Sequence, residues 1–340
     1  MTMNQKWLTI TIPSYNAEQY LETCLRSVCD VNEKTRRAME VLVIDDGSTD
    51  GTRALAEDFA ARYPDTVKVI SKENGGHGSA VNTGISHATG RYFKVVDADD
   101  WVGTEALERL VHVLETADED IVYTEFLWAF DDGSGETGRF RLKAESKEPF
   151  CYVMYDMPYR FDDIADRLYI KMHNMTIRTE LLQKNSIRLD EHCFYVDLEY
   201  ITYPIPYVQT IRFLNETVYY YRLGREGQSV QLKSMQKRKA NYDKVLTALL
   251  RFHRTLNTSA PKQLYIARIA ARAVAGEMKL LLSFPASKEN RARIIRFDRT
   301  LKNYDREVYE ANRNKAVKLL RASNYRLYGL MSAAVRMLMR

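Results

Sequence analysis

Residues 41–52 read Val-Leu-Val-Ile-Asp-Asp-Gly-Ser-Thr-Asp-Gly-Thr, and this stretch decides the fold. Its four apolar residues are typical of a buried strand, and the Asp-Gly and Ser-Thr-Asp sequences that follow favour a turn and a helix start. A helix is expected over 52–61, with Leu55 and Phe59 facing inward. The stretch therefore predicts a strand–turn–helix unit with two adjacent carboxylates where the strand ends.

Similar units occur on both sides of this stretch. Upstream, residues 8–12 predict a strand, and a helix is expected to begin at Asn16 with Gln19 in the capping-box position. Downstream, apolar patterning predicts strands over 67–70 and 92–96 and helices over 79–88 and 104–116. This alternation predicts an α/β fold with a doubly wound, mostly parallel sheet flanked by helices.

The pattern changes after residue 120. Strand-like pieces over 121–140 surround the hairpin signal Asp131-Asp132-Gly133-Ser134-Gly135, and a late strand is expected over 213–223. Gly224 and Gly227 then mark a boundary, beyond which the pattern is mainly helical. We expect two domains, residues 1–225 and a smaller helical domain over 226–340.

Composition excludes several classes of protein. The chain has 340 residues, 45% hydrophobic and 28% charged, which argues against disorder, and no apolar run is long enough to span a membrane. Residues 1–7 lack the order of a secretory signal, and the four cysteines include no CxxC pair, so we expect a cytoplasmic protein with reduced thiols. The net charge of +5 combines an acidic first part with a strongly basic region after residue 224.

Three acidic segments are expected near one edge of the sheet. Asp45-Asp46 follows the second strand, Asp97-Ala98-Asp99-Asp100 follows the fourth, and Asp197 lies in a later segment. Carboxylates that converge on one crevice repel each other unless a cation neutralises them, and oxygen ligands suit Mg²⁺ or Mn²⁺ on a diphosphate. The alternative is that these are solvated turns and helix caps. Ending a buried strand in three carboxylates favours the functional interpretation.

Four motifs in this order resemble the family-2 glycosyltransferases of the GT-A fold. The motifs are Ile12-Pro13-Ser14-Tyr15-Asn16, Val43 to Thr52, Asn74-Gly75-Gly76 with Asn82-Thr83-Gly84, and Val96-Asp97-Ala98-Asp99-Asp100-Trp101. The resemblance is close over about residues 7–130, looser to about 222, and does not reach the basic remainder. It implies a GT-A-like fold and transfer of a sugar from a nucleotide donor, usually a UDP-sugar.

The resemblance also implies roles for individual residues. Asp97 and Asp99 match the DxD element that holds the metal, Mn²⁺ or Mg²⁺, on the diphosphate, and the share of Asp100 stays open. The expected donor-nucleotide residues are Pro13, Tyr15, Asp45, Asp46, Asn74, His77, Asn82 and Asp97. The glycine loop before the 79–88 helix suits a phosphate or a sugar hydroxyl, with Asn82 expected on the helix's first turn. His77 is either a diphosphate contact or a loop or capping histidine.

The family is inverting and needs a general base. Its Glu-Asp pair is matched here by Val196-Asp197, so Asp197 is the expected base, with Asp190, Glu191 and Glu199 as rivals or a helix-capping role as the alternative. Two further positions match the family's second half, which lines the acceptor and diphosphate side. These are His173-Asn174 and Arg222, and Arg222 either pairs with phosphate or stacks on neighbouring tyrosines.

The basic helical region has three possible meanings. Residues 288–340 could lie on an anionic membrane surface, because an apolar stripe with helical spacing over 317–338 lies beside Lys318, Arg321 and Arg336. The region could instead bind an anionic polymer or an acidic protein, or be a bundle with a basic solvent face. No nucleic-acid-binding motif is present.

The sequence predicts a metal-dependent inverting transfer of a hexose or N-acetylhexosamine from a UDP-sugar. The acceptor would be a hydroxyl of a glycan, lipid-linked or protein-linked acceptor in cell-surface polysaccharide or glycoconjugate synthesis, at the inner face of the membrane. A non-catalytic nucleotide-sugar-binding subunit and a sugar nucleotidyltransferase are the alternatives. A nucleotidyltransferase usually has a Gly-rich phosphate loop immediately after the first strand, whereas this chain has Pro13-Ser14-Tyr15-Asn16 there.

Overall fold

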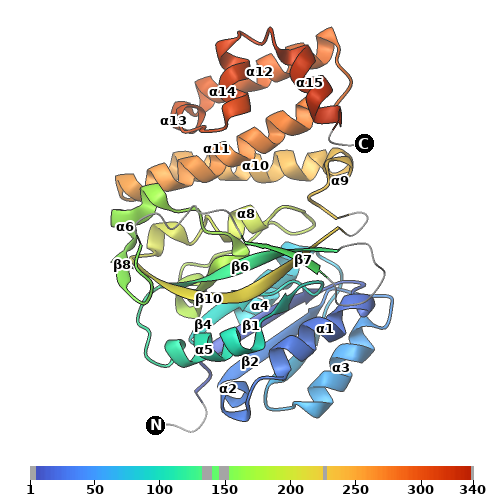
Figure 1. The fold of residues 1–340 in the computed structure, drawn as a ribbon, viewed down its shortest axis with the longest axis vertical. Coiled ribbons are helices and arrows are strands. Elements are labelled where there is room, and N and C mark those ends of the chain that lie inside the picture. The colour runs from blue at the N-terminus through green and yellow to red at the C-terminus, as the bar shows by residue number, and fades with distance from the viewer. Residues whose placement is uncertain (1–4, 132–139, 145–152, 225–227, 338–340) are drawn as a thin grey trace. The chain divides into compact units, whose positions relative to one another are not determined.

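The computed structural model describes residues 5–131, 140–144, 153–224 and 228–337. The chain divides into two compact units, Met1–Glu226 and Gly227–Arg340. Figure 1 shows a sheet flanked by helices in the first unit and an all-helical second unit.

The first unit is built on one mixed sheet. Its strands are β1 (Leu8–Ser14), β2 (Met39–Asp45), β3 (Val67–Ser71), β4 (Tyr92–Val95), β5 (Trp101–Val102), β6 (Ile121–Asp131), β7 (Phe140–Ala144), β8 (Pro158–Arg160), β9 (Met175–Arg178) and β10 (Thr210–Leu223). The strand order is β3-β2-β1-β4-β9-β6-β10-β5, with β7 on β6 and β8 on β10. The neighbours β3, β2, β1 and β4 pair in parallel, whereas β9 is antiparallel to both β4 and β6. This mixed, mostly parallel sheet confirms the predicted fold class.

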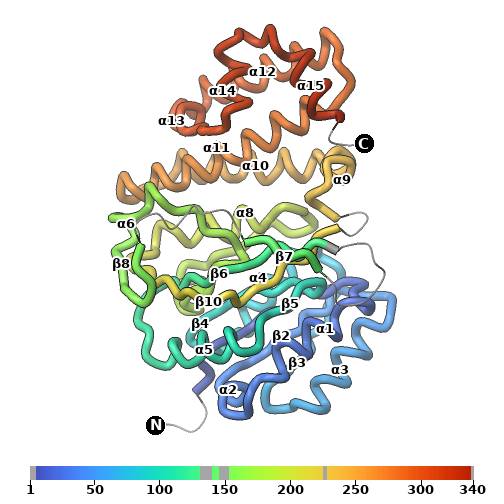
Figure 2. Tube along the Cα trace, viewed as in Figure 1, coloured from blue at the N-terminus to red at the C-terminus, as the bar shows by residue number. Residues whose placement is uncertain are grey.

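Helices cover both faces of this sheet. They are α1 (Glu18–Cys29), α2 (Glu33–Arg37), α3 (Thr52–Arg62), α4 (His77–His87), α5 (Thr104–Leu114), α6 (Phe161–Ile164), α7 (Thr179–Lys184) and α8 (Asp197–Tyr200). The alternation of side chains along β2 explains the arrangement, because Val41 and Val43 join the large core with α1 and α5, whereas Leu42 and Ile44 face Ala80 of α4. Figure 2 traces the chain through these strands and helices.

The first helix begins differently from its predicted start. The helix starts at Glu18, and Asn16 has a left-handed backbone with φ of 47°, so the capping box expected from Asn16 and Gln19 does not form. The backbone N–H groups at the start of the helix donate instead to side chains of a distant segment. Ala17 N donates to Thr52 Oγ1 at 2.7 Å, and Glu18 N donates to Asp50 Oδ2 at 3.2 Å. A tertiary contact thus replaces the local cap.

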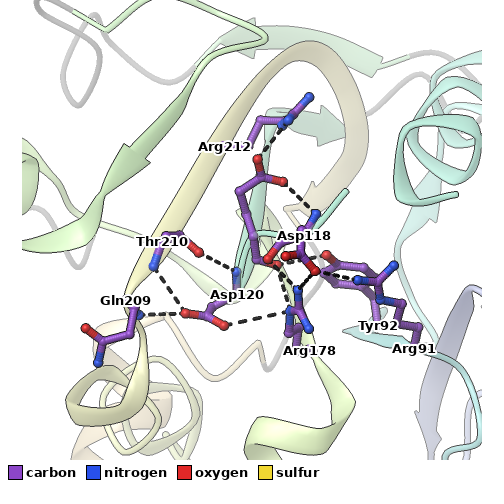
Figure 3. Close-up of polar contacts among 9 residues, drawn as sticks. Arg91, Tyr92, Asp118, Asp120, Arg178, Gln209, Thr210 and Arg212 are labelled. Carbon is purple, nitrogen blue, oxygen red and sulfur yellow. Dashed lines mark hydrogen bonds and ion pairs between the residues drawn. The ribbon is translucent and has the colours of Figure 1, made fainter. Parts of the chain in front are cut away.

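A polar network fastens the sheet at the amino ends of its parallel strands (Figure 3). Asp120, just before β6, accepts from the backbone N–H groups of Gln209 and Thr210 at 2.6 and 3.1 Å. The Tyr92 hydroxyl donates to the carbonyl of Glu119 at 2.8 Å, and Asp118 pairs with Arg91 and Arg178. These hydrogen bonds and ion pairs therefore hold the strands together at the end of the sheet opposite the loops that follow their carboxyl ends.

The second unit consists of packed helices. They are α9 (Leu232–Lys237), α10 (Lys239–Thr255), α11 (Ala260–Leu282), α12 (Lys288–Tyr304), α13 (Arg306–Glu310), α14 (Lys315–Ala322) and α15 (Tyr328–Met337). No helix in the described parts of either unit is long and apolar enough to cross a membrane.

The predicted apolar stripe does not form one continuous helix. It is divided between α14 and α15 by Asn324 and Tyr325, both with positive φ. Leu320 and Tyr328 pack into the unit's own core, and Arg321 pairs with the buried Asp298 at 2.6 Å rather than facing solvent. Leu338, at the end of the stripe, lies outside the described residues. Much of the stripe therefore serves internal packing.

Candidate active site

The site forms where three adjacent parallel strands end. The loops after β1, β2 and β4 leave the same edge of the sheet, because β1 lies between β2 and β4. They carry Pro13 to Asn16, Asp45 to Thr52, and Asp97 to Asp100. This edge is where parallel sheets bind ligands, as the sequence predicts.

The loop after β4 gathers three carboxylates. One oxygen from each of Asp97, Asp99 and Asp100 lies within 4.8 Å of the others. Asp100 is fully buried, accepting from the Tyr219 hydroxyl at 2.6 Å and from Arg222 N at 2.7 Å. Burial, with the charges of Asp99 and Asp97, raises the pKa of Asp100 well above its usual range. Asp97 and Asp99 are partly exposed and fit a hard divalent cation, whereas Asp100 ties the loop to β10.

His77 is the first residue of α4 and faces this acidic loop. Its Nε2 lies 2.9 Å from Asp97 Oδ1. Burial lowers the pKa of His77, but the charge and hydrogen bond of Asp97 outweigh it, so the net pKa lies above the ordinary value. The helix begins two residues earlier than predicted, which places His77 in its first turn and Asn82 in its second.

Asp45 and Asp46 are engaged inside the protein. Asp46 accepts from Gly76 N at 2.7 Å, Gly75 N at 3.0 Å and Lys72 Nζ at 2.9 Å, and Asp45 accepts from Ser48 N at 3.0 Å. Both are nearly fully buried. Their oxygens therefore shape the loop that leads to His77.

Pro13 lies near the carboxyl end of β1, and Tyr15 begins the loop that follows this strand. Pro13 is buried, whereas Tyr15 is 53% exposed and available to a ligand. The exposed Asn74 donates through Nδ2 to the carbonyl of Asp46 at 2.9 Å. The structure thus brings these predicted donor residues to adjacent strand ends and loops, where the side chains of Tyr15 and Asn74 are exposed.

A later segment, residues 189–192, packs against the glycine-rich stretch from Gly75 to Gly78 that leads into α4. Asn82 holds it by donating to the carbonyl of Leu189 at 2.9 Å and accepting from Leu189 N at 2.8 Å. His192 N donates to the carbonyl of Gly75 at 2.5 Å, and a Cβ at Gly78 would overlap the carbonyl oxygen of Asp190. The absence of that Cβ lets residues 189–192 approach α4.

This docking brings Asp197 toward His77 and Asp97. Asp197 begins α8, and although solvent reaches it, desolvation by the surrounding protein raises its pKa; His77 opposes this rise and Asp97 adds to it. Of the rival bases, Glu199 is fully buried and accepts from Asp190 N, while Glu191 contacts Asn82 and Arg188. Asp197 thus lies within electrostatic range of both His77 and Asp97.

Sequence reasoning missed two residues beneath the site. Tyr219, on β10, donates to Asp100 and accepts from Asp97 N at 3.2 Å. Lys94, fully buried on β4, donates to the carbonyl of His173 at 2.8 Å, and burial lowers its pKa to about 7. A lysine in the apolar run Phe93-Lys-Val-Val96 was a visible signal, because buried charges are rare without a partner.

The two positions expected on the acceptor side have packing roles in this structure. The His173 ring stacks against Tyr221, with centroids 4.6 Å apart, and the buried Asn174 donates to the carbonyl of Thr124 at 2.8 Å. The Arg222 guanidinium lies over the rings of Tyr20 and Trp101, which favours the stacking alternative.

Gly78→Ala should destabilise the first unit by about 1–3 kcal/mol, because the added methyl group would displace the carbonyl of Asp190. The measurement is urea unfolding followed by tryptophan fluorescence, since all three tryptophans lie in the first unit. Ser86→Ala, at an exposed position on the same helix, is the matched control and should change stability little. If the two variants are equally stable, the packing of residues 189–192 on α4 does not depend on the close contact between Gly78 and the Asp190 carbonyl.

Comparison with known proteins identifies the class. The sheet has the GT-A-like fold that solved structures share. The model of the family described as glycosyl transferase family 2 matches residues 9–178, and the chain belongs to this family. Both the predicted family and the predicted enzyme class are confirmed.

Among curated relatives, the chain is 28% identical over 222 residues to the uncharacterized glycosyltransferase EpsJ of Bacillus subtilis, covering 63% of this chain and 60% of EpsJ. It is 25% identical over 252 residues to the minor teichoic acid biosynthesis protein GgaB of the same organism, covering 73% of this chain and 26% of GgaB.

Solved structures with the same fold include S. aureus TarS. Its full structure has a TM-score of 0.63 at 18% identity, covering 95% of this chain and 55% of TarS, and its 1–349 portion was solved in complex with UDP-GlcNAc. The mannosyltransferase PcManGT of Pyrobaculum calidifontis, in complex with GDP-Man and Mn²⁺, has a TM-score of 0.53 at 16% identity, covering 98% of this chain and 87% of PcManGT. The chain thus spans little more than half of the full TarS chain and about 60% of EpsJ.

Proposed function

We propose that this glycosyltransferase transfers a hexose or N-acetylhexosamine from a UDP-sugar to a hydroxyl of a cell-surface glycan or glycoconjugate, with inversion and with Mn²⁺ or Mg²⁺. The observation that carries the proposal is the convergence of Asp97, Asp99 and His77 with Asp197 at one edge of the sheet. The relative named for teichoic acid biosynthesis, GgaB, supports the cell-surface glycan, and the TarS complex with UDP-GlcNAc supports the UDP donor.

The donor would bind over the loops after β1, β2 and β4. Tyr15 is exposed for contact with the nucleotide base, while Asp45, Asp46 and Asn82 would act largely by holding the loops through the hydrogen bonds described above. His77 would face the diphosphate from the amino end of α4, where N–H groups and a raised pKa both favour an anion.

The metal would be held by Asp97 and Asp99, which offer the partly exposed oxygens of the acidic cluster. When bound, it supplies positive charge that stabilises the departing diphosphate. Asp197 would accept the proton of the acceptor hydroxyl as that oxygen attacks the anomeric carbon. Desolvation raises the pKa of Asp197 and so makes its carboxylate a stronger base than an ordinary aspartate.

The test is a screen for UDP release from UDP-Glc, UDP-Gal, UDP-GlcNAc and UDP-GalNAc, with and without Mn²⁺ or Mg²⁺ and with a mixture of simple sugar acceptors. The proposal predicts metal-dependent release from one of these donors. A parallel assay measures GDP release from GDP-Man. GDP release from GDP-Man, with no UDP release from any UDP-sugar, would overturn the choice of nucleotide while leaving the reaction class intact.

We further propose that residues 1–225 form the catalytic domain and that the basic helical domain over 226–340 brings the enzyme to an anionic membrane at the inner face of the cell. Support comes from α14, where Lys315 and Lys318 are exposed beside Leu319, which is 53% exposed.

Lys315→Glu together with Lys318→Glu should reduce sedimentation with phosphatidylglycerol-containing vesicles by about tenfold or more, since each basic residue near such a surface contributes about 1 kcal/mol. Deleting α12 to α15 is a poorer test, because these helices share a core with Leu281 and Leu282. The control replaces Arg26 and Arg53, exposed on the first unit, by glutamate. Unchanged sedimentation of the lysine variant would reject this role.

A further inference from the structure

A groove in the helical unit has the composition of a ligand site. It encloses about 410 Å³, which lies within the usual range of small-molecule pockets of roughly 300–1,000 Å³. Figure 2 traces α10, α11 and α12, and both α10 and α12 pack on α11. The groove runs between residues of these three helices. Its apolar lining is Leu246, Leu250, Leu281, Phe297, Leu301 and Tyr304.

The groove lining also includes a buried carboxylate, Glu277. Glu277 of α11 is 2% exposed, and its Oε1 pairs with Lys239 Nζ at 2.7 Å. Its other oxygen, Oε2, is buried without a hydrogen-bond partner among the residues that the structure describes. A buried acceptor without a donor costs about 1–3 kcal/mol, so a ligand hydroxyl that reached Oε2 from the groove would recover that cost. Burial raises the pKa of Glu277 to about 7, against the opposing effect of Lys239.

The charges around Glu277 indicate which donor fits. Lys239 also pairs with Asp243 at 2.5 Å, and Arg293 lines the same groove. Above about pH 7, where Glu277 is ionised, two cations and two carboxylates leave this end of the groove close to neutral. A ligand ammonium would meet Lys239 and Arg293, and a ligand phosphate or carboxylate would meet Glu277 and Asp243. A neutral hydroxyl can donate to Oε2 without either repulsion.

We propose that this groove binds a neutral amphiphile, with its hydrocarbon chain against the leucines and Phe297 and its hydroxyl donating to Glu277. The site lies wholly within residues 239–304 and is separate from the carboxylates of the proposed sugar transfer. The inference goes beyond the proposed function, and its measurement is binding rather than turnover.

The probe is 1-decanol, titrated calorimetrically into the full chain and compared with decanoate and decylammonium. Wild-type protein should bind 1-decanol at least about tenfold more tightly than either charged analogue. Equal or tighter binding of decylammonium would overturn the neutral head group, and absence of decanol binding up to its solubility limit would overturn the site.

Two variants locate the binding. Leu250→Trp fills the groove from its half-buried wall, and Glu277→Leu removes the acceptor without opening a cavity; each should weaken decanol binding about tenfold or more. Leu330→Trp, at an exposed position on α15 outside the groove lining, is the control and should bind as wild type. Equal affinity in all three variants would reject the groove. A concentration-dependent dimer abolished by Leu250→Trp would instead assign this surface to a second copy of the chain.

Discussion

Asp99→Ala should lower metal-dependent sugar transfer on the order of 10³-fold in kcat/KM. Asp99 lies on the loop after β4 with one oxygen within 4.8 Å of those of Asp97 and Asp100. Removing it takes away one of the two partly exposed carboxylates proposed to hold the cation, and the lost stabilisation of the departing diphosphate amounts to several kcal/mol. The measurement is initial rate of UDP release across a range of Mn²⁺ concentrations.

The control for this prediction is Asp58→Ala, which removes an exposed carboxylate paired with Arg62 on α3. It should leave both the rate and the metal dependence unchanged. Because Asp100 anchors β10 through Tyr219 and Arg222, the Asp99 variant should retain its fold, which circular dichroism can verify. Near-normal activity in Asp99→Ala would contradict the metal assignment.

Asp197→Asn should lower kcat by about 10²–10⁴-fold while leaving the affinity for the donor nearly unchanged. The amide keeps the size of the side chain but cannot take the proton of the acceptor hydroxyl. The wild-type rate should fall as the pH is lowered, because the base must be deprotonated, and its acid limb should lie above that of an ordinary aspartate since the pKa of Asp197 is raised. Rates and donor affinity are measured separately, by transfer kinetics and by calorimetry.

Glu191→Gln is the matched control, because Glu191 lies on the same segment but contacts Asn82 and Arg188. It should retain most activity. If Asp197→Asn transfers sugar normally while Glu191→Gln does not, the base belongs to Glu191 and the proposed role of Asp197 is wrong.

The sequence could predict the strands and the acidic loops because these depend on local pattern. The run Val41 to Ile44 is apolar enough to be buried on both faces, and it is followed at once by Asp45 and Asp46. Parallel pairing then places these loops together with those after β1 and β4. The motif order adds the family, which the structure and the family match support.

Contacts between distant segments could not be predicted in this way. The start of α1 depends on Thr52 and Asp50, which satisfy its N–H groups from another loop. The hydrogen bonds that the buried Asp46 accepts depend on the fold of the 72–76 loop, which supplies their donors. Tyr219 reaches Asp100 across 119 residues of sequence, and no periodicity announces such a contact.

The apolar stripe over 317–338 shows a different limit. Helical spacing placed Leu320 and Tyr328 on the apolar stripe, but the same spacing suits a membrane surface or a protein core. The buried Leu320 and Tyr328 decide for the core at those positions, because their partners Leu281 and Leu282 come from α11.

The central claim is that the loops at this edge of the sheet form one metal-dependent site for a nucleoside diphosphate. Calorimetric titration of UDP into the wild-type chain, with and without Mn²⁺, tests it most directly. The account predicts that Mn²⁺ tightens UDP binding about tenfold or more and that Asp99→Ala removes this enhancement. UDP binding that is absent, or that is the same with Mn²⁺, without it and in the variant, would contradict the account.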